Sequence, residues 1–190
     1  MKNTKEYQII KNVLKDKESF IIAIDGMCGS GKSTLAKLLS EDLKANVVSI
    51  DYFYLPFKYR KENWMDIIAG NIDFDRFNKD IIKPYFNKEN YTLYQYNHST
   101  DDISFISNEQ FNPRLIIEGS YSLHPLLINN YDYKIFVECD KDIQLKRLSQ
   151  RENINFDKFV SIWIPKEDKY HMEMNVKEKA DITIDSSFFF

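Results

Sequence analysis

Gly26-Met27-Cys28-Gly29-Ser30-Gly31-Lys32-Ser33-Thr34 holds three of the five glycines in this chain of 190 residues and follows the pattern G-x-x-x-x-G-K-S. This pattern is the Walker A phosphate loop. Its glycines let several backbone N–H groups approach one anion, and a helix that begins directly after it adds the positive end of its dipole. Lys32 supplies a mobile cation, and the Ser33 hydroxyl is placed to bind Mg²⁺. We therefore predict that residues 26–34 bind the phosphates of ATP together with Mg²⁺.

The residues on either side of the loop fit this interpretation. Residues 19–25 form a short apolar run, which predicts a buried parallel strand. After the loop, leucines recur at helical spacing, at Leu35, Leu38, Leu39 and Leu43. An ordinary glycine turn in an unrelated strand–helix unit would not explain why Lys32 and Ser33 stand at the start of this helix.

Apolar runs and helical periodicity alternate along the rest of the chain. Further strands are predicted at residues 46–50, 115–119, 134–139 and 182–184. Helices are predicted at residues 4–16, up to a glycine stop at 67–70, at 74–85 and after Asp140. This alternation indicates an α/β protein, a P-loop NTPase three-layer αβα sandwich around a parallel sheet of about five strands. Two extended runs, at residues 91–96 and 103–106, predict a small antiparallel insertion.

The length suits one domain with a substantial core, so residues 1–190 are predicted to form a single P-loop domain. Within it we expect a leading helix over residues 1–17 and a β insertion near the acceptor site over residues 86–112. Lid and cover helices are expected over residues 141–170, where Pro165 suits the first turn of a helix.

Composition and charge narrow the classes of partner. The net charge is −3, so no overall basic field is present to attract nucleic acid or a membrane surface. Of the two cysteines, Cys28 lies inside the glycine loop, a poor place for a structural disulfide. No signal peptide and no long apolar segment is found, so we expect a soluble cytoplasmic protein that acts on a small molecule. The sequence leaves open whether it forms a homo-oligomer.

Two carboxylates follow strands of the predicted sheet. Asp51 comes after the strand at residues 46–50, and Glu118 ends an apolar strand. Because ligands of parallel sheets bind at the carboxyl ends of the strands, we expect both to face the glycine loop. Ser33 and Glu118 are candidates to organise Mg²⁺, with Asp51 beside the same ion. Asp51 is also the candidate to accept the proton of an attacking hydroxyl. The alternatives are a turn carboxylate for Asp51 and a salt bridge to a lysine for Glu118.

A pair of arginines adds a candidate for the transferring phosphoryl group. Arg147 and Arg151 are four residues apart, which would place them on one face of the helix predicted after Asp140. The guanidinium fork suits phosphate oxygens better than an ammonium does. We expect a lid over the phosphoryl group, and the alternative is a solvated basic face beside Asp142 and Glu152.

Polar and aromatic residues between the strands suggest an acceptor pocket. A polyhydroxylated acceptor would need a carboxylate for paired hydroxyls and rings to stack on a flat base. The candidates are Tyr54, Asp73, Arg76, Tyr96 and His98, together with a late cluster of Trp163 and Glu167. The alternatives are a tyrosine-rich surface appendage for the first group, a purely structural role for His98, and packing of a cover helix for Trp163.

Through these residues the chain resembles the uridine kinase family of P-loop kinases, which is similar to phosphoribulokinase and pantothenate kinase. The resemblance spans most of residues 19–185 and rests on residues 25–34, 51–54, 71–73, 118–119 and 180–182, with Arg147 and Arg151. It is closest to a compact bacterial branch through residues 118–125 and 163–167.

The resemblance implies a role for several residues. It places Asp51 at the catalytic base position and Ser33 with Glu118 at the magnesium positions. It puts Asp73 where the family binds ribose hydroxyls, Tyr96 near the base, and Arg147 and Arg151 at the lid arginines. The implied reaction is ATP- and Mg²⁺-dependent phosphorylation of the 5′-hydroxyl of uridine or cytidine.

Departures from the family pattern keep other acceptors open. The family's Tyr-Asp reads Tyr96-Asn97 here, the basic residue that follows is missing, and residues 74–77 replace a proline-rich stretch. A kinase of a sugar phosphate, a pantothenate-like acid or another alcohol is therefore the alternative. A nucleotide-dependent switch or GTPase is less consistent with the sequence, because residues 78–81 carry the Asp of a guanine motif one place early.

Overall fold

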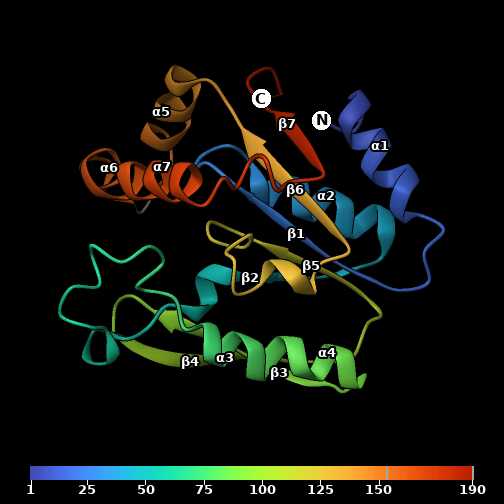
Figure 1. Ribbon diagram of the computed structural model, residues 1–190, viewed down its shortest axis with the longest axis horizontal. Coiled ribbons are helices and arrows are strands. Elements are labelled where there is room, and N and C mark those ends of the chain that lie inside the picture. Colours follow the sequence, from blue (N-terminus) through green and yellow to red (C-terminus); the bar gives the residue numbers. More distant parts are fainter. Residues whose placement is uncertain (153, 190) are drawn as a thin grey trace.

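A five-stranded parallel sheet in the order β2-β5-β1-β6-β7 forms the centre of the computed structural model, which describes residues 1–152 and 154–189 (Figure 1). The strands are β1 (Phe20–Gly26), β2 (Asn46–Ser49), β5 (Arg114–Glu118), β6 (Tyr133–Glu138) and β7 (Ile182–Asp185). All four neighbouring pairs run parallel. This confirms the predicted α/β class and the number of strands.

The central strand β1 is buried on both faces, and its alternating residues divide the core into two layers. Ile22 and Ile24 pack against the helices α1 (Lys5–Leu14) and α2 (Lys32–Leu43). Ile21 and Ala23 point to the opposite face. Because both faces of this strand are buried, its sequence is a continuous apolar run and does not alternate between apolar and polar residues. None of the helices within the described residues is long and apolar enough to cross a membrane.

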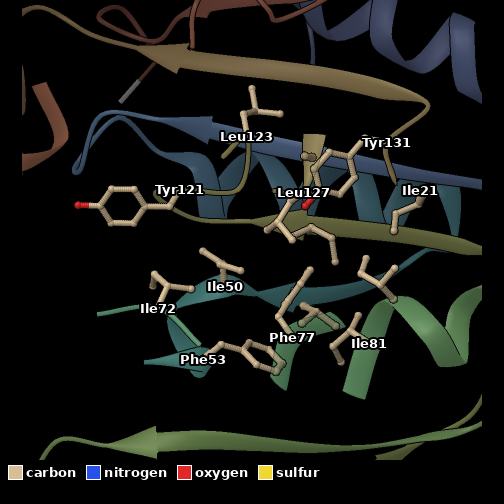
Figure 2. Close-up of a cluster of buried hydrophobic side chains, with 14 of the residues drawn as sticks. Ile21, Ile50, Phe53, Ile72, Phe77, Ile81, Tyr121, Leu123, Leu127 and Tyr131 are labelled. Atoms are coloured by element: carbon tan, nitrogen blue, oxygen red, sulfur yellow. The ribbon is translucent and has the colours of Figure 1, made fainter. Parts of the chain in front are cut away.

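The second face of the sheet carries the insertion. It comprises α3 (Phe74–Phe77), the π-helical turn η3 (Asn78–Ile82), α4 (Lys83–Asn87) and the antiparallel pair β3 (Tyr91–Asn97) and β4 (Asp102–Glu109). Figure 1 shows these elements below the sheet. In Figure 2 the side chains of Phe53, Phe77 and Ile81 pack beneath Tyr121, Leu123 and Leu127. The antiparallel insertion is thereby confirmed, and it is attached to the sheet by apolar packing.

The helices after β6 differ from the prediction at one important point. They are α5 (Lys141–Ser149), α6 (Phe156–Lys158), the π-helical turn η5 (Phe159–Trp163) and α7 (Ile164–Glu173), with Pro165 in the first turn of α7 as expected. Helix α5 ends at Ser149, and the Arg151 N–H bonds to the Leu148 carbonyl three residues back in a closing turn. The prediction that Arg147 and Arg151 share one helical face is therefore wrong.

The segment before the insertion also differs from the prediction. After the short 3₁₀ helix η2 (Phe57–Tyr59), residues 62–71 form consecutive turns, so no helix ends at residues 67–70. The N–H groups of Trp64 and Gly70 each bond three residues back, to Lys61 and Ile67. A side chain at Gly70 would place its Cβ 2.5 Å from the Trp64 carbonyl oxygen. The glycine therefore allows two segments of backbone to approach closely, and it does not end a helix.

Candidate active site

Three strand ends meet at one edge of the sheet. In the register of β5, Glu118 is paired with Ile24 of β1 and with Ser49 of β2. The glycine loop follows β1, and the 3₁₀ helix η1 (Ile50–Phe53), which carries Asp51, follows β2. The loop, Glu118 and Asp51 thus come together because the strands that precede them are neighbours.

The glycine loop has the backbone of an anion site. Gly26 and Gly31 have φ values of 136° and 92°, and Gly31 is the residue before α2. A side chain at Gly26 would place its Cβ 1.9 Å from the Val137 carbonyl oxygen, so only glycine fits there. The first N–H groups of α2 have no carbonyl partner within the helix, and the helix dipole adds positive potential at this end. The loop is therefore suited to bind phosphate.

Lys32 places a cation inside this loop. Its side chain is buried, and its Nζ donates to the carbonyl oxygens of Gly26 at 2.7 Å and Met27 at 2.9 Å. These bonds hold the ammonium group at the loop. A polyphosphate that enters the loop would meet a positive charge that is already in place.

Ser33 and Glu118 bring two oxygen ligands side by side. The Ser33 Oγ donates to the Glu118 Oε2 at 3.0 Å. A hydroxyl and a carboxylate oxygen fit Mg²⁺, which prefers oxygen ligands and usually keeps waters and substrate phosphates as its others. In the parts of the chain that the structure describes, no three His, Cys, Asp or Glu side chains form a complete metal cage.

Asp51 has the character of a proton acceptor. Its Oδ1 accepts a hydrogen bond of 3.0 Å from the Tyr54 hydroxyl, and the residue remains open to solvent. Desolvation by the surrounding protein atoms and the negative charge of Glu118 raise the pKa of Asp51 to about 6, against the opposing effects of Lys32 and Tyr54. A carboxylate with such a pKa is ionised at neutral pH and basic enough to take a proton from a hydroxyl as a bond to phosphorus forms.

Asp25, which was not singled out from the sequence, lies at the base of the loop. It is fully buried and accepts from the N–H groups of Gly26 at 2.6 Å and Leu123 at 2.8 Å, and from the Tyr170 hydroxyl at 2.7 Å. Burial acts to raise its pKa, but His171, the Leu123 N–H and the Tyr170 hydroxyl together outweigh burial and lower the pKa. A carboxylate at the end of an apolar strand is costly unless paired, and the same reasoning that selected Glu118 could have found it.

Glu167 also serves the loop. Its Oε2 accepts from the Cys28 N–H at 2.7 Å, and its Oε1 accepts from the Ser120 hydroxyl at 2.6 Å. The residue is buried. The sequence suggested that it contacts the acceptor, whereas the structure places both carboxylate oxygens between the phosphate loop and the turn after β5.

Of the two predicted lid arginines, Arg147 reaches the loop. Its Nη1 lies 3.4 Å from the Gly29 carbonyl oxygen and 3.0 Å from the Ser186 Oγ, and its Nη2 donates to the Ser186 carbonyl at 2.7 Å. Arg151 lies beyond the end of α5 and is exposed. The bonds to Ser186 attach Arg147 to the segment after β7 rather than leaving it on a surface.

Asp73 and Arg76 lie directly beside the helix that carries Asp51. The Asp73 N–H donates to the Phe53 carbonyl at 2.7 Å, and its Oδ1 caps α3 by accepting from the Arg76 N–H at 2.9 Å. The Arg76 Nη2 donates to the Tyr52 carbonyl at 2.7 Å. The guanidinium group also lies 4.3 Å from the centre of the Phe53 ring. The structure therefore brings both predicted acceptor residues next to η1.

Aromatic rings continue from Asp51 towards the insertion. The Tyr54 ring lies 5.7 Å from the His98 ring and 6.1 Å from the Tyr96 ring, and the last two are 4.7 Å apart. The Tyr96 hydroxyl donates to the Asp101 Oδ1 at 2.9 Å. Partial burial and the nearby Arg60 lower the pKa of His98, so its imidazole is neutral at pH 7.

Three residues from the turns before the insertion join these rings and were missed in the sequence. The Arg60 guanidinium lies 4.0 Å from the centre of the Phe57 ring, 4.6 Å from that of Trp64 and 5.7 Å from that of Tyr96. Trp64 in turn lies 6.4 Å from Trp163, which was predicted as an acceptor residue. Neither a motif nor a hydrophobic period marks this segment, and the only signal was an arginine between aromatic residues.

Comparisons with known proteins identify a family and several relatives of this chain. A family model described as an AAA domain matches residues 22–161. A uridine kinase from Staphylococcus epidermidis is 27% identical over 152 residues, covering 71% of this chain and 69% of that protein. A bifunctional pantoate ligase/cytidylate kinase from Prochlorococcus marinus is 43% identical over 74 residues, but this match covers 39% of this chain and only 13% of that protein.

The fold comparison covers more of the chain. The structure of a possible uridine kinase from Bacillus stearothermophilus superposes with a TM-score of 0.70, over 94% of this chain and 96% of that one. The two sequences are 22% identical, so this likeness concerns the fold. The surrounding scaffold, and not only the glycine loop, is thus shared with a P-loop kinase fold.

Proposed function

This chain belongs to the AAA domain family, and we propose that it is a P-loop kinase of the uridine kinase type whose acceptor is the 5′-hydroxyl of uridine or cytidine. The family relationship supports phosphorylation of a small metabolite at the expense of ATP. The choice of a pyrimidine nucleoside rests on the arrangement of the acceptor residues. The proposed site residues are those described above.

One observation carries the proposal: the ends of β1, β5 and β2 bring the glycine loop, Glu118 and Asp51 to one place. The contact of Ser33 with Glu118 at 3.0 Å links the loop to β5. The negative charge of Glu118 raises the pKa of Asp51 and the positive charge of Lys32 lowers it, which supports a site that these three residues share. A phosphate, a metal ion and an acceptor hydroxyl could therefore be held together.

The residues of this chain can perform an in-line transfer. The loop N–H groups and Lys32 would hold the β- and γ-phosphates, and Ser33 and Glu118 would hold Mg²⁺, which would neutralise phosphate charge. Asp51 orients the acceptor hydroxyl and takes its proton while the oxygen bonds to the γ-phosphorus and the bond to the ADP oxygen breaks. Arg147 lies at the same loop and supports the added negative charge.

The acceptor assignment follows from the groups next to Asp51. Asp73, beside η1, offers a carboxylate for paired ribose hydroxyls. The rings of Tyr54, Tyr96 and His98 form a surface suited to a flat base. This combination favours a nucleoside over an acyclic alcohol.

The test is a panel of acceptors with the purified protein, Mg²⁺ and ATP. The panel holds uridine, cytidine, two purine nucleosides, ribose, a sugar phosphate and pantothenate. We expect the highest kcat/KM with uridine or cytidine and none without Mg²⁺. Efficient phosphorylation of another alcohol, with neither pyrimidine nucleoside used, would contradict the proposed acceptor while leaving the kinase chemistry intact.

A further inference from the structure

We propose that Arg60 is a specificity-determining residue, whose guanidinium group binds hydrogen-bond-accepting oxygen atoms on a flat group at the far end of the acceptor. In the proposed nucleoside this group is the pyrimidine base. The inference rests on the proposed function in one respect, because it takes Asp51 to mark the hydroxyl end of the acceptor.

Two tyrosine rings connect Asp51 with Arg60. Asp51 accepts from the Tyr54 hydroxyl at 3.0 Å, the Tyr54 ring lies 6.1 Å from the Tyr96 ring, and the Arg60 guanidinium lies 5.7 Å from the centre of the Tyr96 ring. In Figure 1 the loop that carries Arg60 lies at the left of the molecule, below α6 and α7. An acceptor whose hydroxyl is at Asp51 and whose flat group follows these rings would extend towards Arg60.

The guanidinium group is held in a fixed orientation. Its Nε donates to the Leu55 carbonyl oxygen at 2.7 Å, and its plane lies against Phe57 and Trp64, 4.0 Å and 4.6 Å from the ring centres. An arginine that is fixed by a hydrogen bond and by stacking loses less side-chain entropy when it binds a ligand. The ring of Phe57 is itself 57% exposed, so this side of the cluster is not covered by the protein.

The terminal nitrogen atoms of Arg60 are not committed to a carboxylate. Over residues 1–152 and 154–189, Arg60 forms no ion pair with a carboxylate. Asp101, the acidic residue of the cluster, accepts instead from the Phe57 N–H at 2.9 Å and 3.2 Å and from the Tyr96 hydroxyl. The Arg60 side chain also hydrogen-bonds to the side chain of Tyr96. The N–H groups that are bonded neither to Tyr96 nor to Leu55 are the donors that Arg60 offers to a ligand.

The charges around the cluster favour an electron-rich ligand. Lys166 of α7 places a second cation 5.4 Å from the Trp64 ring and donates to the Met65 carbonyl. Asp101 lies within electrostatic reach of Arg60 and Lys58, and Asp66 lies within reach of Lys166, so two carboxylates face three cations. The remaining positive charge suits carbonyl or carboxylate oxygens, and the fork of N–H groups suits two acceptors on one planar group.

The experiment compares an acceptor that carries the flat group with one that lacks it. Wild type, Arg60→Gln and Arg60→Lys are assayed with uridine and with ribose at saturating Mg²⁺ and ATP. We expect Arg60→Gln to lower kcat/KM for uridine by about 10- to 100-fold, mainly through KM, because a hydrogen bond from a charged donor is lost. The value for ribose should stay within about twofold, and Arg60→Lys should recover part of the loss with uridine.

A matched control comes from the 3₁₀ helix η2, which ends one residue before Arg60. Lys58 is exposed and lies 5.0 Å from the ring of Tyr59, so Lys58→Gln should behave as wild type with both acceptors. An equal fall with uridine and ribose in Arg60→Gln would mean that Arg60 only holds the loop, and this would overturn the inference. An unchanged KM for uridine would overturn it as well.

Failure of the proposed acceptor can be told apart from failure of this inference. If the wild type uses neither uridine nor cytidine, the nucleoside proposal fails, and Arg60→Gln is assayed with the panel member that the wild type uses best. An increase in the KM of Arg60→Gln for that acceptor would support the role of Arg60, and an unchanged KM would overturn it. If no acceptor with a flat, oxygen-bearing group raises the melting temperature of the wild type with Mg²⁺ and a non-hydrolysable ATP analogue, the inference is overturned directly.

Discussion

The phosphate half and the acceptor half of this site are built in different ways. Around the glycine loop, the carboxylates Asp25 and Glu167 each bind at least two donors of the chain, and the ends of three neighbouring strands fix the positions. In the acceptor half, aromatic rings from a turn segment and a two-stranded hairpin meet mostly through ring contacts. The first half is defined by the backbone, and the second by side chains on loops.

This difference predicts two kinds of mutational effect. A change in the phosphate half should abolish turnover for every acceptor, because each acceptor needs the same phosphates and the same base. A change in the acceptor half should alter which acceptor is used while ATP binding persists. The variants below test that division, starting with the largest expected effect.

Lys32→Ala should reduce kcat by about 1,000-fold or more, because it removes the cation that is held by the Gly26 and Met27 carbonyls and faces the transferring phosphate. Turnover is measured by coupled detection of ADP with the best acceptor. Lys37→Ala on the exposed side of α2 is the control and should keep wild-type rates. More than a tenth of wild-type activity in Lys32→Ala would show that the loop does not bind the reacting phosphate.

Asp51→Asn should lower kcat by about 100-fold or more, because an amide cannot take the proton of the acceptor hydroxyl. Binding of ATP should persist, since the loop amides and Lys32 are unchanged. The two readouts are kcat and the melting shift with an ATP analogue and Mg²⁺. Asp16→Asn, at an exposed position, serves as the control. Full activity in Asp51→Asn would remove Asp51 from the role of base.

The pH profile gives an effect of intermediate size. The pKa of Asp51 is raised to about 6, so the carboxylate is ionised above this pH and becomes protonated as the pH falls through it. Because the ionised form is the one that accepts the proton, kcat/KM for the acceptor should be level near pH 7.5. Below pH 6 it should fall about tenfold for each further unit. A profile that stays level down to pH 5 would contradict either the raised pKa or the role of Asp51.

The same division explains how much the sequence could predict. The glycine loop, Asp51 and Glu118 lie at the ends of strands with clear apolar runs. Parallel strands bring their carboxyl ends to one edge of the sheet, so the local pattern and the topology both predict that these residues lie together. Arg60 lies in a segment that has no period and is placed only by contacts with Tyr96 and Trp64, far away in the sequence. The basic residue that follows Tyr-Asp in the family is missing after Tyr96-Asn97, and nothing in the local sequence pattern points to Arg60 as its counterpart.

Two other residues show why tertiary placement escapes a pattern. Arg151 was assigned to the helix of Arg147 because spacing alone does not show where a helix ends, and α5 ends before it. Glu167 was grouped with the acceptor residues because it stands close to Trp163 and Pro165 in the sequence. Its own side chain points to Cys28 because successive residues of a helix face different directions.

Asp25→Asn should lower the free energy of unfolding by about 2 kcal/mol, because an amide replaces a buried carboxylate that binds three donors. The pKa of Asp25 is lowered in the folded state, so its contribution is present above the pKa of the unfolded chain and is lost as the pH falls through the folded value. The difference between wild type and variant, measured by urea unfolding, should therefore shrink in acid. A constant difference down to pH 3 would contradict this account.

Glu167→Gln should have the smallest effect and is the sharpest test of how separate the two halves are, because α7 contacts both. Glu167 binds the Cys28 N–H and the Ser120 hydroxyl, while Trp163 and Lys166 on the same segment contact Trp64. A glutamine can accept from the Cys28 N–H with its oxygen and donate to Ser120 with its amide nitrogen, so kcat should stay within about threefold of wild type. Glu167→Ala loses both bonds and should raise the KM for ATP about tenfold. If the acceptor KM rose equally in Glu167→Ala, helix α7 would couple the halves, and the division between backbone-defined and loop-defined parts would have to be abandoned.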